Sequence, residues 1–118
     1  MNLLKLTLTL MVLLLSRPAA ADNSKPHTWT SAADLVERCN TVDQFSAGEC
    51  AGYVVGVAEI TDSGYLKGYR SCIPPRVNKG QLADAVKKYV AKHPDYQQSV
   101  GYQVVVMALV ESFPCDKQ

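Results

Sequence analysis

The sequence carries no surplus of charge of either sign. Its 118 residues hold 12 Lys and Arg against 11 Asp and Glu, which gives a formal charge of +1 at pH 7. Proteins that bind nucleic acid or anionic membrane surfaces through charge display a basic excess. The balance therefore argues against both classes of partner, and a chain of this length has room for one small domain.

The groups that enzymes and metal sites require are also scarce. The only histidines are His27 and His93, no C-x-x-C pair occurs, and Asp and Glu are scattered singly. A Cys–His nucleophile pair needs a free thiol, and a structural zinc site needs closely spaced pairs of ligands. We therefore predict no catalytic residue, no metal site and no cofactor, and interpret the chain as a binding protein rather than an enzyme.

A hydrophobic run long enough to cross a membrane is missing as well. The apolar run at residues 6–15 follows Lys5 and precedes Arg17 and the small residues Ala19, Ala20 and Ala21. A membrane span needs about 20 apolar residues, whereas a signal peptide has a shorter run and an A-x-A cleavage site. We predict that residues 1–21 are a cleaved signal peptide. Residues 22–118 then form one domain with ten basic and 11 acidic residues, free of the membrane.

All four cysteines lie beyond the predicted cleavage site. They are Cys39, Cys50, Cys72 and Cys115. An even number of cysteines in a short exported chain indicates disulfides and an oxidising compartment. We expect two disulfide bonds and a location in the bacterial periplasm.

Three helix-start signals divide the remaining chain. Each pairs a short polar residue with an acid or amide three positions later, so that the two side chains satisfy free backbone N–H groups at the helix start. The pairs are Ser31 with Asp34, Ser46 with Glu49, and Asn78 with Gln81. The sequence therefore predicts helices that start at these three signals, the second running to about Gly64.

The last segment is apolar on nearly every side. It is expected to begin after Asp95 and to end before Pro114, which cannot continue a helix. Residues 104–106 are all Val and favour a strand, but the apolar pattern persists for about 14 residues, which favours a helix. We predict an all-α, up-and-down bundle of about four helices. This last segment should be the most buried of them, and Trp29, just before the first helix, should pack on the core of the bundle.

The geometry of such a bundle limits which cysteines can form disulfide bonds with one another. Cys39 ends the first helix and Cys50 lies in the first turns of the second, at one end of a hairpin. Cys72 follows the second helix and Cys115 the fourth, at the opposite end. A Cys50–Cys72 bond would have to close a helix of roughly 30 Å, against a Cα separation limit of about 7 Å. We therefore favour Cys39–Cys50 and Cys72–Cys115.

Glycines recur at every fourth position of the second helix. Gly48, Gly52 and Gly56 form a stripe without side chains. Each Gly costs a helix interior about 1 kcal/mol relative to Ala, so three need a compensating reason. We predict that a neighbouring helix or a second chain packs closely on this stripe.

Several short motifs together resemble the Rap/Tai immunity proteins, over about residues 30–115. The motifs are Cys50-Ala51-Gly52-Tyr53 with Gly56, then Cys72-Ile73-Pro74, and finally Phe113-Pro114-Cys115. The resemblance implies a small, all-helical periplasmic homodimer. It also implies that the protein binds and inhibits a peptidoglycan amidase effector delivered by a type VI secretion system. The immunity protein of such an effector–immunity pair would block the amidase cleft and protect sibling cell walls.

The motif residues are scaffold and do not mark the contact surface. Connections that combine aromatic side chains with charge are better candidates, because rigid aromatic anchors carry much of the binding energy at interfaces. The candidate effector-binding residues are Tyr65, Lys67, Tyr69 and Arg70 in one connection, and His93, Pro94, Asp95 and Tyr96 in the next. The alternative is that these tyrosines only cover the ends of the bundle.

A periplasmic acid-stress chaperone is the alternative function, because such proteins are also small, helical and disulfide-linked. A chaperone of this type loosens when its buried carboxylates are protonated and then exposes apolar surface. Acidic residues are few here, and lysines are not gathered at the chain ends. Binding of an apolar dye at low pH distinguishes the two functions.

Overall fold

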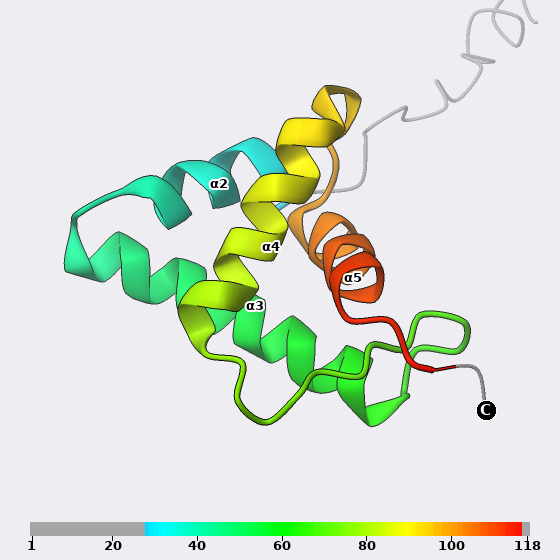
Figure 1. Ribbon diagram of the computed structural model, residues 1–118. Coiled ribbons are helices and arrows are strands. Elements are labelled where there is room, and N and C mark those ends of the chain that lie inside the picture. The colour runs from blue at the N-terminus through cyan, green and yellow to red at the C-terminus, as the bar shows by residue number, and fades with distance from the viewer. Residues whose placement is uncertain (1–27, 117–118) are drawn as a thin grey trace, which may run out of the picture.

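The computed structural model describes residues 28–116. This part of the chain contains four α-helices and one short 3₁₀ helix. They are α2 (Ala32–Asn40), α3 (Gln44–Ser63), α4 (Lys79–Lys92), η1 (Pro94–Tyr96) and α5 (Gly101–Ser112). Each α-helix contacts the other three, and α3 and α4 cross one another (Figure 1). The prediction of a small all-α bundle is confirmed. The predicted signal peptide, residues 1–21, lies outside the described residues.

Two of the three predicted helix starts are confirmed. Ser31 and Asn78 cap α2 and α4, and in both cases the reciprocal side chain three residues later is bonded back to the cap. The predicted start at Ser46 is wrong. α3 begins at Gln44, because the Asp43 carboxylate accepts a hydrogen bond from the Ser46 N–H at 2.8 Å and so caps the helix three residues earlier.

The predicted start of the last helix is also wrong. α5 begins at Gly101, and Pro94–Tyr96 form η1 instead. The Gly101 N–H donates to the Thr30 carbonyl at 2.8 Å, and the Ala32 N–H donates to the Ser99 carbonyl at 2.9 Å. This pairing with the start of α2 occupies the backbone before α5. It also favours a glycine, because a Cβ at position 101 would lie 3.0 Å from the Thr30 carbonyl oxygen, a tight contact with backbone.

The core receives side chains from all four α-helices. Its largest fully buried apolar side chains are Leu35, Val54, Val86, Val105 and Leu109. Burying a Val or Leu side chain contributes about 1.5–3 kcal/mol. The three consecutive valines lie in a helix and not in a strand, as their segment length predicted. Trp29 is 87% exposed, so the prediction that it packs on the core is wrong.

Two disulfides close the bundle with the predicted pairing. Cys39 and Cys50 join α2 to α3, with their Cα atoms 5.1 Å apart. Cys72 and Cys115 join the segment before α4 to the segment after α5, with their Cα atoms 4.9 Å apart. The four cysteines of the chain are therefore all oxidised.

The glycine stripe of α3 faces away from the other helices. Nothing in the described part of the chain lies within 4 Å of a Cβ built at Gly48, Gly52 or Gly56. The prediction that a neighbouring helix of the same chain packs on the stripe is therefore wrong, because the packed face of α3 carries Val54 and Ala58 instead. The close approach of a second chain stays a prediction.

Candidate protein-interaction surface

The first predicted connection is an exposed loop after α3, residues 64–70. Gly64 has a φ of +78° and ends α3 in the left-handed conformation, and Gly68 has a φ of +82°. Both positions favour glycine, which has no Cβ to oppose this conformation. Tyr65 is 86% exposed and Tyr69 is 49% exposed. The loop thus presents two aromatic side chains to solvent, beside Lys67 and Arg70, which are also exposed.

The second predicted connection continues the end of α4. The ring centroids of Tyr89 and His93 lie 4.3 Å apart, and the Tyr96 ring stacks over Tyr89 at 6.4 Å with 10° between the planes. His93 ends α4, and its backbone N–H donates to the Tyr89 and Val90 carbonyls. Tyr89 is buried, so this stack fixes the half-exposed Tyr96 on the end of the bundle.

An open groove of about 430 Å³ brings the two connections together. Leu66 and Tyr69 come from the loop, and Tyr96 comes from η1. The other lining residues are Tyr89, Ser99, Tyr102, Gln103, Val104, Val106 and Met107. The six remaining predicted residues do not line this groove; they are Tyr65, Lys67, Arg70, His93, Pro94 and Asp95. We call it the aromatic groove. Each predicted connection contributes one half-exposed tyrosine to it, Tyr69 from the first and Tyr96 from the second.

Three exposed residues of the groove, Tyr102, Gln103 and Met107, were missing from the sequence prediction. Tyr102 is 50% exposed and Met107 is 41% exposed, both on α5. The helix is apolar nearly all round, so its composition does not show which side lies open. A tyrosine hydroxyl within an apolar helix is the signal that could have found the open side, since buried Tyr needs a hydrogen-bond partner.

The groove is apolar and electrically neutral along its walls. Burial is the main cause that raises the pKa of the Tyr89 phenol above its ordinary value of 10.0, and the nearby Tyr96 raises it further. The phenol therefore stays protonated at neutral pH. Outside the lining residues, an ion pair joins Lys92 on α4 to Glu111 on α5, with the Nζ and Oε1 atoms 3.5 Å apart.

The chemistry of the described residues around the groove is that of a contact surface. The cysteines are oxidised, the His93 ring packs against Tyr89, and the described residues contain no group of three or more His, Cys, Asp or Glu that could hold a metal ion. Within the same residues, no helix has the length and apolar character to span a membrane. Half-exposed tyrosines and a methionine that line the same groove form an amphipathic surface of the kind that protein partners use.

Comparisons with known proteins are consistent with such a surface. The family model described as Rap1a immunity proteins matches residues 31–115, which is most of the chain. Comparison with curated proteins and with solved structures gave no match. The matched range includes all four α-helices and both disulfides.

Proposed function

Because this chain belongs to the Rap1a immunity protein family, we propose that its cognate toxin effector is a peptidoglycan amidase delivered by a type VI secretion system. The immunity protein binds this amidase in the periplasm and blocks its active-site cleft. The observation that carries the proposal is the aromatic groove, in which the two predicted connections meet. The family membership and the resemblance of the sequence motifs support the rest.

Export to the periplasm is part of the proposal. Two disulfides need an oxidising compartment, and cell-wall amidases act there. Residues 1–21 carry the pattern of a signal peptide, and we place cleavage before Asp22. The intact mass of the protein isolated from the periplasm tests this point. A mass that retains residues 1–21 would contradict it.

The inhibition is steric. A rigid aromatic surface that covers the mouth of the amidase cleft excludes the stem peptides of the cell wall without any chemistry by the immunity protein. Tyr69, Tyr96 and Tyr102 supply large contact areas at a small entropy cost, since a Tyr side chain has few rotatable bonds.

Protection and binding assays test the function with single variants. The product of the neighbouring gene is tested for amidase activity and exported to the periplasm, and cell lysis is measured with and without this protein. We expect Tyr69→Ala and Tyr96→Ala each to weaken binding by about 1–2 kcal/mol, roughly tenfold or more, and to reduce protection. Val42→Ala removes an exposed apolar side chain between α2 and α3, outside the groove and outside the glycine stripe of α3, and serves as the matched control.

The outcomes separate the parts of this proposal. If the wild-type protein neither binds the amidase nor prevents lysis, the proposed effector is wrong. If it protects and the two tyrosine variants protect equally well, the binding surface lies elsewhere on the molecule.

We also propose that the protein forms a homodimer through the exposed face of α3. Phe45 and Ile60 are 75% and 47% exposed and lie at the two ends of the stripe formed by Gly48, Gly52 and Gly56. A two-fold axis near Gly52 would place each Phe45 over Ile60 of the second copy, which makes the face self-complementary.

Sedimentation of the wild type and of Gly52→Arg tests the proposed homodimer: a dimeric wild type and a folded, monomeric variant support it. Glu37→Arg on α2 is the control, and a monomeric wild type contradicts the proposal.

A further inference from the structure

The loop that carries Tyr69 is tied to the bundle mainly at its ends. Inside the loop, the Tyr69 N–H donates to the Leu66 carbonyl at 3.0 Å, and at its start the Gly64 N–H approaches the Thr61 carbonyl at 3.4 Å. Tyr65 and Lys67 project from it and are exposed. The described hydrogen bonds that join the end of the loop to other elements lie at residues 71–73.

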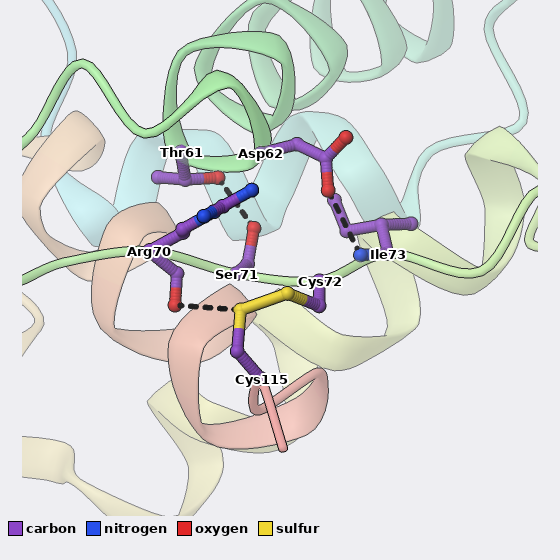
Figure 2. Close-up of a disulfide and its surroundings, with 7 residues drawn as sticks. All are labelled: Thr61, Asp62, Arg70, Ser71, Cys72, Ile73 and Cys115. Carbon is purple, nitrogen blue, oxygen red and sulfur yellow. Dashed lines mark hydrogen bonds between the residues drawn. A yellow bond between two sulfur atoms is a disulfide. The ribbon is translucent and has the colours of Figure 1, made fainter. Parts of the chain in front are cut away.

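The first anchor at these residues binds α3. The hydroxyl oxygens of Thr61 and Ser71 lie 2.8 Å apart, and both residues are fully buried. Thr61 donates its hydrogen to the Ala58 carbonyl, so Ser71 is the donor to Thr61. The Ile73 N–H donates to Asp62 Oδ1 at 2.9 Å (Figure 2). This anchor fixes the loop end relative to α3, which contributes no residue to the groove.

The second anchor binds the end of α5. The Cys72 N–H donates to the Phe113 carbonyl at 2.8 Å, and Cys72 is covalently bonded to Cys115. Cys115 Sγ lies 3.9 Å from the Arg70 carbonyl oxygen (Figure 2). A disulfide sulfur has no hydrogen to donate, so this approach is a packing contact. The disulfide thus connects the two walls of the aromatic groove, the loop on one side and α5 on the other.

We propose that the Cys72–Cys115 disulfide and the Ser71 hydroxyl are positioning groups that hold the Tyr69 loop against α5 and preform the aromatic groove. The inference rests on the proposed function in that the groove is the surface that binds the amidase. Holding a loop in its bound conformation before binding removes the entropy cost of ordering its side chains. The Cys39–Cys50 disulfide joins α2 to α3, and neither helix lines the groove.

The main test compares the two disulfides. Cys72→Ala/Cys115→Ala and Cys39→Ala/Cys50→Ala are examined at a temperature where circular dichroism shows each to be folded. We expect the first variant to bind the amidase about tenfold more weakly per folded molecule, and the second to retain wild-type affinity. The Ser71 N–H donates to the Thr61 carbonyl at 3.2 Å. Amide hydrogen exchange, measured without amidase, should speed up at the backbone N–H groups of Tyr69, Ser71 and Cys72 in the first variant only.

A single-atom variant tests the positioning without changing a disulfide. Ser71→Ala removes the donor to Thr61 and leaves the Thr61–Ala58 bond intact. We expect faster exchange of the loop amides and weaker binding. Ser63→Ala removes an exposed hydroxyl that bonds the Ile60 carbonyl at the end of α3 and makes no described bond to the loop, so it should change neither.

Each outcome has a distinct meaning. Unchanged loop exchange and unchanged affinity in both the Cys72/Cys115 and Ser71 variants overturn the positioning role. A Cys72/Cys115 variant that loses its helical signal at every temperature, combined with a silent Ser71→Ala, assigns the disulfide to fold stability and also overturns it. A wild type that does not bind the amidase, with loop exchange that changes as expected, overturns the proposed function but not the positioning.

Discussion

The two disulfides join different kinds of segment: one joins neighbours in the sequence, and the other joins segments far apart in it. Cys39 and Cys50 are 11 residues apart and bracket the short turn between two consecutive helices. Cys72 and Cys115 are 43 residues apart and join a loop to the chain segment after the last helix. The first bond reinforces a contact that the turn already makes, whereas the second joins segments that the intervening helices must first bring together.

The surroundings of the two bonds differ in the same way. Near Cys39–Cys50, the neighbouring side-chain interaction is an exposed ion pair, Arg38 Nε to Glu49 Oε2 at 3.7 Å, which contributes little in water. Near Cys72–Cys115, two fully buried hydroxyls bond to one another. A buried, satisfied polar pair specifies one arrangement, because any displacement leaves a desolvated group without a partner. The region next to the groove is therefore the more precisely defined of the two.

Removing each disulfide should produce the largest effects on stability. The chain-entropy model gives about 4 kcal/mol for the 43-residue loop closed by Cys72–Cys115, and about 3 kcal/mol for the 11-residue loop closed by Cys39–Cys50. We expect this order in the free energies of unfolding of the two double-alanine variants, measured by urea denaturation. A greater loss at Cys39–Cys50 would show that native packing at the α2–α3 turn outweighs loop entropy.

The buried hydroxyl pair should give the next largest effect, and an asymmetric one. Thr61→Val removes the acceptor and leaves the Ser71 hydroxyl buried without a partner, which costs about 1–3 kcal/mol. Ser71→Ala leaves Thr61 bonded to Ala58 and should cost only about 1 kcal/mol.

The double variant measures the coupling between the two hydroxyls. Thr61→Val with Ser71→Ala leaves no orphaned hydroxyl, so it should be less destabilising than the sum of the single variants. Urea denaturation of all four proteins gives the coupling energy. Strict additivity would show that the two side chains contribute independently to this region.

The sequence predicted these regions unequally, for physical reasons. The capping boxes at Ser31 and Asn78 depend on residues three positions apart, and both are present. The start of α5 depends instead on backbone pairing between Thr30 and Gly101, which no local pattern shows. The disulfide pairing was predictable because an up-and-down bundle places Cys39 and Cys50 at one end and Cys72 and Cys115 at the other, a helix length apart.

The aromatic groove was predicted only in part, for a related reason. Tyr69 and Tyr96 stand out as aromatic residues in polar connections, so composition places them among the candidates, together with Tyr65, which does not line the groove. Tyr102 and Met107 lie within an almost wholly apolar helix, and their exposure depends on which side of α5 the other helices leave open. That information lies in the packing of the bundle and not in the segment itself.

The smallest expected effect concerns acid and the turn beside Cys39–Cys50. The backbone N–H of Ser46 is the main cause that lowers the pKa of the Asp43 carboxyl below its ordinary value of 3.8. Because the pKa is lower in the folded state, this cap stabilises the fold at pH values above the ordinary pKa, and the contribution is lost as pH falls through the folded value.

Asp43→Asn should therefore make stability less dependent on pH in the acid range while preserving the helix start. Asn is also a good N-cap residue, but its side chain does not titrate. We expect the urea midpoint of the variant to fall less steeply below about pH 4 than that of wild type. Asp95→Asn removes a negative charge from an exposed site and controls for net charge. If the two variants show the same pH profile, the acid response comes from overall charge, and the α2–α3 turn is no more sensitive to acid than the groove end.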